Sequence, residues 1–151
     1  MGQILLPAVC IKIGRNFVMV IKNHFGGLST PFRMQLVYRK AADQGYAGAQ
    51  FNLGFMYANG RGVAKDEVEA VKWLRKAADQ GNANAQSNLG NMYWVGNGVV
   101  KDELEAYKWF LLSGAQGNEG AKKEIPIVEK DLTATQRLEG QRLAREWKSK
   151  K

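Results

Sequence analysis

A block of 36 residues occurs twice in succession in the middle of this chain. Residues 41–76 and 77–112 align without gaps, and 23 of the 36 positions are identical. A period between about 20 and 50 residues predicts a stacked array of small units, because one unit alone cannot bury its apolar face. Arrays of this kind mostly present surface to partners, so the repeat favours a binding role over catalysis.

Each block predicts two helices separated by a glycine-containing loop. Residues at helical spacing indicate helix A over about 47–58 and helix B over about 67–79 in the first block. Asp66 precedes helix B, where an N-cap residue is expected. The second block predicts the same pair over about 83–94 and 103–113.

A glycine recurs inside each helix A, as Gly54 and Gly90. A glycine in a helix interior costs about 0.5–1 kcal/mol relative to alanine. That cost is accounted for if another helix crosses closely at these two positions. Large side chains repeated at the remaining inner positions predict the core: Leu53, Met56, Tyr57, Trp73, Leu89, Met92, Tyr93 and Trp109.

The two blocks share the pattern A-x-A-Q-x-N-L-G-x-M-Y-x-x-G-x-G-V-x-K-D-x-x-E-A-x-K-W. This pattern resembles the Sel1-like repeat, whose helix-turn-helix unit is similar to the tetratricopeptide repeat but has a longer period. The resemblance covers residues 41–112 and continues backward over residues 38–40. It implies an all-α fold, a short right-handed α/α solenoid, and an adaptor or scaffold role in protein complexes.

The repeat domain is predicted to span residues 37–151, with a degenerate third unit and a cap after residue 112. Residues 114–118 begin a third unit in register, but the core motif is then lost, and Pro126 is expected to break or bend a helix there. Thr133 and Gln136 form a plausible capping box for a last helix. That helix is predicted over about 134–148, with one apolar face formed by Gly140, Leu143, Ala144 and Trp147.

The repeat pattern is absent upstream of Val37. Residues 1–36 are therefore predicted to be a non-repeat segment that is either poorly ordered or forms a hairpin, with residues 14–16 as the turn between two short strands. A rival interpretation is that this segment derives from a displaced start or a reading-frame accident. In that case it was never selected to fold with the array.

The formal net charge of +8 is unevenly distributed along the chain. Residues 1–40 carry six basic residues and no acid, whereas residues 41–112 carry seven basic and eight acidic residues. A nucleic-acid reader is expected to concentrate basic charge on its folded reading face, so nucleic acid is a disfavoured partner. The alternative of a nucleic-acid binder rests on a basic tail: Arg142, Arg145, Lys148, Lys150 and Lys151.

The case for an enzyme is weak. The chain contains one histidine, His24, and one cysteine, Cys10, so neither a Ser-His-Asp triad nor a metal cluster can be assembled within the array. We therefore expect no catalytic residue, cofactor or metal. An alternative is a β-lactamase-like hydrolase related to the cysteine-rich Sel1-like proteins, but their hallmark is a pair of cysteines in each repeat, which this chain lacks. The repeated acids after each loop are interpreted as helix starts.

Along helix A, the positions that differ between the two blocks fall within roughly one sector of the helix. With two bordering asparagines, these positions form what we call the helix A face, the predicted partner-binding surface. Its members are Gly48, Phe51, Asn52, Phe55, Asn59, Asn84, Ser87, Asn88, Asn91 and Trp94.

Three interpretations of the helix A face remain open at the level of sequence. It can be an unconstrained solvated face, or a groove that binds a protein or peptide, or a surface covered by the N-terminal segment. Phe51 and Phe55, one helical turn apart, favour an interaction patch. Asn52 and Asn88 can hydrogen-bond either an extended peptide or their own neighbours.

The remaining expectations concern compartment and assembly. The chain has no apolar run of about 18 residues and no convincing secretory signal, so a cytoplasmic location is the default, with a periplasmic or secreted location left open. The identity of the partner cannot be inferred from sequence. Since about three repeats are commonly needed for an independent array, a homodimer formed by end-to-end stacking is also expected to be feasible.

Overall fold

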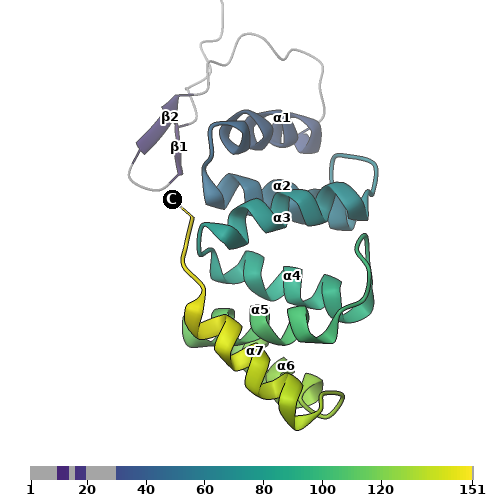
Figure 1. Cartoon of the computed structure of the whole chain (residues 1–151). Coiled ribbons are helices and arrows are strands. Elements are labelled where there is room, and N and C mark those ends of the chain that lie inside the picture. Colours follow the sequence, from purple (N-terminus) through teal and green to yellow (C-terminus); the bar gives the residue numbers. More distant parts are fainter. Residues whose placement is uncertain (1–9, 14–15, 20–29, 151) are drawn as a thin grey trace, which may run out of the picture.

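The computed structural model describes residues 10–13, 16–19 and 30–150, with side chains from Arg33 onward. Within these residues it contains a two-stranded hairpin and seven helices (Figure 1). Strand β1 (Cys10–Ile13) pairs antiparallel with β2 (Asn16–Met19). The strands lie where a hairpin was expected, but the turn residues 14–15, His24 and most of the N-terminal segment are outside the described residues.

The helices stack in chain order and form the predicted all-α solenoid (Figure 1). The closest pairs are α2 with α3 and α4 with α5, the A and B helices of the two blocks. The helices are α1 (Thr30–Asp43), α2 (Ala47–Asn59), α3 (Glu67–Asp79), α4 (Ala83–Val95), α5 (Glu103–Ala115), α6 (Glu119–Val128) and α7 (Ala134–Glu146).

The ends of the repeat helices follow from their capping residues. The Asp66 side chain accepts a hydrogen bond of 2.9 Å from the backbone N–H of Glu69, as expected of an N-cap. Asp102 caps α5 in the same way. Helices α2 and α4 end at Gly60 and Gly96, which adopt left-handed φ angles of 66° and 84°. These signals explain why the predicted bounds of all four helices hold to within two residues.

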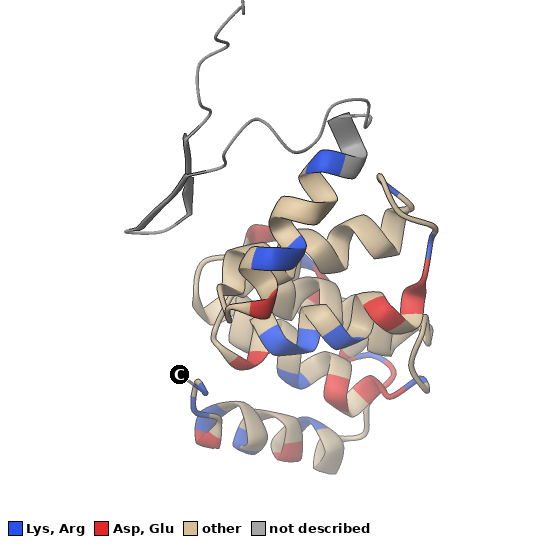
Figure 2. Ribbon diagram, turned by 90° about the horizontal axis from the view of Figure 1, so that it is seen from above, with Lys and Arg blue, Asp and Glu red and all other residues tan. Residues whose placement is uncertain are grey.

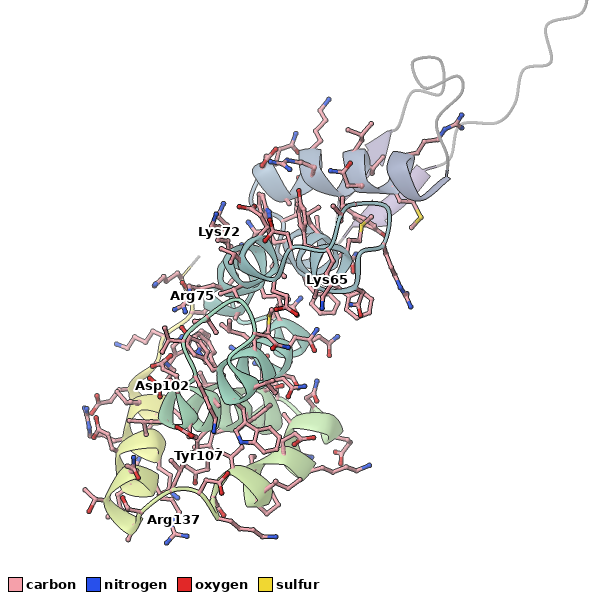
Figure 3. All side chains as sticks on the ribbon, turned by 90° about the vertical axis from the view of Figure 1, so that its right-hand side faces the viewer. Lys65, Lys72, Arg75, Asp102, Tyr107 and Arg137 are labelled. Carbon is pink, nitrogen blue, oxygen red and sulfur yellow. The ribbon has the colours of Figure 1, made fainter. Side chains whose placement is uncertain are left out.

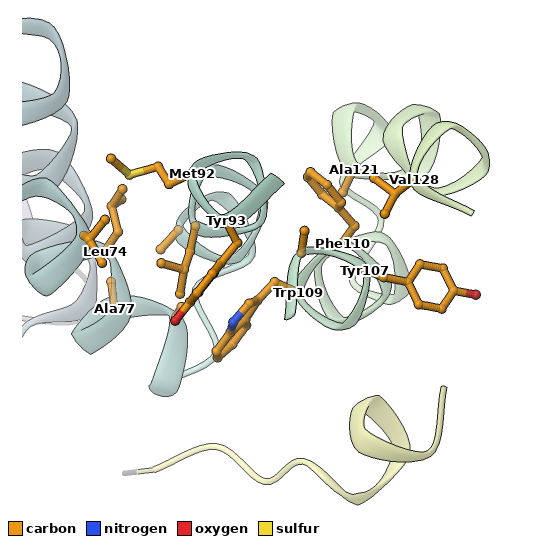
Figure 4. Close-up of a cluster of buried hydrophobic side chains, with 14 of the residues drawn as sticks. Leu74, Ala77, Met92, Tyr93, Tyr107, Trp109, Phe110, Ala121 and Val128 are labelled. Carbon is orange, nitrogen blue, oxygen red and sulfur yellow. The ribbon is translucent and has the colours of Figure 1, made fainter. Parts of the chain in front are cut away.

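The predicted close crossings occur at both helix glycines. A Cβ placed on Gly54 would lie 2.8 Å from Cγ of Leu74, and one on Gly90 would lie 3.0 Å from the Phe110 ring. The first distance is shorter than real Cβ contacts and the second is tighter than most of them, so glycine lets the A and B helices approach closely at both positions. Further along the core, Tyr93 and Trp109 lie side by side between α4 and α5 (Figure 4).

A ladder of glutamine side chains joins a helix A to its own helix B and to the helix before it. The Gln80 Nε2 donates to Oε1 of Gln50 at 2.7 Å, and Gln50 in turn donates to the carbonyl of Ala42. Gln116 and Gln86 repeat the first of these contacts at 2.7 Å one unit later. Because a buried amide without partners is costly, this ladder explains why both glutamines recur in the 36-residue pattern.

Helix α1 was not predicted as a whole. It begins at Thr30, upstream of the boundary between residues 36 and 37, and it takes the place of a helix B in front of α2. Its start lacks the acidic residues that mark the other B helices, and Pro31 stands in its first turn, where proline is tolerated. The boundary itself stays a prediction.

The end of the array differs from the prediction in two places. Pro126 was expected to break or bend a helix; the break does not occur, since α6 continues through Pro126 and ends two residues later at Val128. A proline so close to a helix end removes only one late hydrogen bond, so the helix tolerates it. Helix α7 begins with the predicted capping box of Thr133 and Gln136. It ends at Glu146, so Trp147 lies in an extended tail and not in the last helical turn.

Candidate partner-binding surface

The helix A face lies on α2 and α4, and none of its ten residues is buried. Gly48, Asn59, Asn84 and Asn91 are exposed to solvent. The other six members are half-buried: Phe51, Asn52, Phe55, Ser87, Asn88 and Trp94. The structure therefore places all ten residues on the A helices of two consecutive repeats and leaves each of them partly accessible.

The three aromatic residues of this face differ in how far they belong to the core. Phe51 and Trp94 pack against the buried cluster that α3, α4 and α5 share. Phe55 packs instead on Phe51, with ring centroids 6.2 Å apart, and the guanidinium of Arg61 lies 5.4 Å from its ring centroid. Phe55 is thus the aromatic member with the least support from the core.

The asparagines of the helix A face also fall into two groups. The Asn59 side chain donates to the carbonyl of Phe55 at 2.8 Å, and the Asn84 Oδ1 accepts from Asn118 at 3.0 Å. Asn52 and Asn88 form no side-chain hydrogen bond with any other described residue. An asparagine amide offers both a donor and an acceptor, which are the groups that an extended peptide backbone presents in return.

A pocket of about 330 Å³ opens at the C-terminal ends of α2 and α4. Four members of the helix A face line it: Phe55, Asn59, Asn88 and Asn91. Its wall also includes Val95 and Asn97, which were not among the predicted site residues. Both differ from their counterparts in the first block, so the comparison of the two blocks carried this signal as well.

The acidic residues near this pocket serve the helix starts. Glu67 forms an ion pair of 2.8 Å with Lys65, and its copy Glu103 pairs with Lys101 at the same distance. The hydrogen bond from Lys101 lowers the pKa of the Glu103 carboxyl, which keeps it charged at the positive end of α5. Within the described part of the chain, no group of three or more His, Cys, Asp or Glu residues could hold a metal ion.

The charged residues gather in no single patch over the described helices, since basic and acidic positions are interspersed (Figure 2). Two members of the basic tail are already paired. Arg142 forms ion pairs with Glu139 and Glu146, and Lys150 pairs with Asp79 at 2.9 Å. These contacts reduce the basic charge that α7 and the tail could offer to a polyanion.

Comparison with protein families identifies the repeat. The model of the Sel1 repeat matches residues 38–46, 47–82 and 83–118, which together make up more than half of the chain. The chain belongs to the Sel1 repeat family. The two full Sel1 repeats have the period of the 36-residue blocks but begin six residues later, at the start of each helix A. Members of this family are generally protein–protein interaction modules.

Two solved structures show the same Sel1 fold. One is a protective antigen present in uropathogenic Escherichia coli strains, with 39% identity and a TM-score of 0.75 over 77% of this chain. The other is a Sel1 repeat protein from Oxalobacter formigenes, with 43% identity and a TM-score of 0.60 over 62% of this chain. This chain spans only 25% and 38% of those two proteins.

A search of curated proteins gave no match. None of the helices in the described residues combines the length and the apolar character needed to cross a membrane.

Proposed function

We propose that this Sel1 repeat protein is an adaptor that binds an extended segment of a partner protein along its helix A face. The observation that carries the proposal is the state of Asn52 and Asn88. These two amides stand at equivalent positions of consecutive repeats, on a face that is not buried, and neither is used by a described neighbour. A peptide backbone lying across α2 and α4 would satisfy both.

The pocket beside Asn88 supplies the second half of the proposed site. Its polar rim of Asn59, Asn88 and Asn91 surrounds an apolar floor that includes Leu74 and Met92. A side chain of the bound segment can enter here and contact the Phe55 ring. Interfaces commonly combine a central aromatic anchor with a polar, hydrogen-bonding rim.

The test is affinity capture from a native lysate, with the captured protein identified and then bound again as a purified component. Phe55→Asp should reduce capture at least about tenfold, because it places a charge in the apolar part of the site. The melting temperature should stay within about 5 °C of wild type, since Phe55 has little support from the core.

A matched control is Val100→Asp, at a loop residue that is 86% exposed and outside the helix A face. This variant should capture the partner as wild type does. A large loss of stability in Phe55→Asp would identify the ring as core. Equal capture by wild type and Phe55→Asp would place the partner elsewhere on the protein.

A further inference from the structure

The extended tail after α7 lies across the array and contacts two B helices. The Trp147 ring meets the Trp109 ring edge to face, with centroids 6.3 Å apart. Three residues later, the backbone N–H of Lys150 donates to the carbonyl of Asp79 at 2.7 Å, and the Lys150 ammonium pairs with the Asp79 carboxylate at 2.9 Å. The tail therefore uses an aromatic ring and a lysine to hold an extended backbone against α3 and α5.

The tail borders a cavity of about 380 Å³, and the helices supply the remaining wall. The six wall residues from the helices are Arg75, Asp79, Tyr93, Glu105, Lys108 and Trp109. Each has a copy of the same residue type one period earlier in the chain. We call these copies the α1–α3 groove: Arg39, Asp43, Tyr57, Glu69, Lys72 and Trp73.

The α1–α3 groove has the same framework as the site that holds the tail. Helix α1 packs on α2 as α3 packs on α4. The backbone turn repeats as well, since Tyr46 N–H donates to the carbonyl of Ala41 and Asn82 N–H donates to that of Ala77. The ion pair between Lys72 and Glu69 repeats as the pair between Lys108 and Glu105.

The α1–α3 groove lacks, at Gly45 and Lys72, the cover that the second site has at Gly81 and Lys108. A Cβ added to Gly81 would lie 3.6 Å from Oγ of Ser149 and 3.7 Å from the Trp147 ring, whereas one added to Gly45 would meet nothing within 4 Å. The Lys72 side chain is 60% exposed and that of Lys108 only 14%. Lys72 and Arg75 lie on the same side of the helix stack (Figure 3).

Two polar groups of the α1–α3 groove lack the partners that their copies have. The Asp43 carboxylate forms no ion pair with a described residue, whereas Asp79 binds Lys150. The buried Trp73 Nε1 has no hydrogen-bond partner, whereas the Trp109 Nε1 donates to Glu105 at 3.1 Å. Of these two partners only Lys150 belongs to the tail, so the Asp43 carboxylate lacks the contact that the tail supplies to Asp79.

We propose that the α1–α3 groove is a second docking site, which takes an extended segment of a partner protein carrying an aromatic residue followed three positions later by lysine. The aromatic ring packs against Trp73 as Trp147 packs against Trp109. The lysine pairs with Asp43 as Lys150 pairs with Asp79. The groove shares no residue with the helix A face, so the two proposals can fail separately.

One position is expected to make the α1–α3 groove a weaker binding site than the site that holds the tail. Lys76 stands where the second block has Leu112, and its Nζ lies 4.2 Å from the centroid of the Trp73 ring. An incoming aromatic ring has to displace this ammonium, which is exposed and held only weakly. Lys76→Leu should therefore increase the affinity of the groove for the segment.

The probe is a peptide that copies residues 144–150, blocked at both ends and titrated against the full chain by calorimetry. We expect saturable binding of one equivalent. A peptide carrying Trp147→Ala should bind about 30-fold more weakly, as is usual for the loss of an aromatic hot spot. Asp43→Lys in the protein should weaken binding about tenfold through repulsion of the peptide lysine.

The matched control is Asp79→Lys, which alters the site already occupied by the tail and should leave peptide affinity unchanged. Circular dichroism checks that both variants remain folded, which is expected for an exposed residue such as Asp43. Absence of saturation at millimolar peptide would overturn the proposal. So would unchanged affinity in Asp43→Lys, or loss of binding confined to Asp79→Lys, since the peptide would then be exchanging with the tail.

Discussion

The two complete units fold alike but face different neighbours. In both, a helix glycine admits the following B helix, at Gly54 against Leu74 and at Gly90 against Phe110. The first unit is followed by another repeat and carries Val71 on its B helix, whereas the second is followed by the cap and carries Tyr107 at the same position. The residues that the two units share thus define how helix A packs on helix B within a unit. The residues that differ fit each unit to the repeat or cap that follows it.

Tyr107 is the residue that adapts the second unit to the cap. It is fully buried, and its hydroxyl donates to the Glu129 carboxylate at 2.6 Å. A Cβ on Gly140 of α7 would lie 2.5 Å from Cδ1 of the Tyr107 ring, so only glycine lets α7 approach. The smaller Val71 could form neither contact.

The largest expected effects on stability come from truncating the two repeated tryptophans, and the two losses should differ. Trp73→Ala should lower the free energy of unfolding by about 3–5 kcal/mol, because it empties a buried site. Trp109→Ala should cost about 1 kcal/mol more, since it also removes the edge-to-face contact with Trp147. Urea unfolding of both variants measures the difference. A smaller loss in Trp109→Ala would show that the cap adds nothing to the second unit.

Removal of the Tyr107 hydroxyl should have the next largest effect. Tyr107→Phe should destabilise the fold by about 1.5–3 kcal/mol, because Glu129 loses a hydrogen bond to its charged carboxylate. Tyr93→Phe is the matched control, since the Tyr93 hydroxyl has no hydrogen-bond partner among the described residues. Equal losses in the two variants would argue against a special role for the hydroxyl at the cap.

Alkaline pH should weaken the second unit in a way that depends on Tyr107. Burial, followed by the hydrogen bond to Glu129, raises the pKa of the Tyr107 hydroxyl. Because the folded pKa lies above the unfolded value, its contribution is complete below about pH 10 and is lost as the pH rises through the folded pKa. The stability difference between wild type and Tyr107→Phe should therefore shrink above about pH 10. A difference that stays constant in urea unfolding up to about pH 11 would contradict this.

The smallest effect is expected at the tail. Lys150→Ala should cost less than about 1 kcal/mol, since the Lys150 side chain is 76% exposed and the backbone hydrogen bond to Asp79 remains. Lys148→Ala is the control, because Lys148 forms no ion pair with a described residue. A loss in Lys148→Ala as large as that in Lys150→Ala would mean that the tail is held by general charge and not by this contact.

The sequence predicted those parts of the fold whose signals are local and repeated. The glycine stops and Asp caps located α2 to α5, and the periodic small residues identified the close crossings. Helix α1 was missed because its start at Thr30 carries no acidic residue and it has only a partial match to the repeat. Its place in the array depends on contacts with α2, which no local pattern encodes.

The candidate sites were likewise predictable only where the signal was local and repeated. The comparison of the two blocks gathered the helix A face onto one surface, because a position that differs between copies cannot serve an identical packing contact. The path of the tail could not be predicted in this way. Lys150 reaches Asp79 across 71 residues of chain, and nothing near either residue in the sequence signals that contact.

The glutamine ladder gives the array a modular length. Its two rungs each join residues 30 positions apart, from a helix A to the end of the helix B that follows it, so every rung lies within one helix pair. A spare 36-residue block inserted upstream of the unit that carries Tyr107 would gain its own rung and leave the cap untouched. If the same block were placed after that unit, valine would face α7 at the position that Tyr107 now occupies. We therefore expect the array to accept an added unit upstream of the one that carries Tyr107 more readily than between that unit and α7.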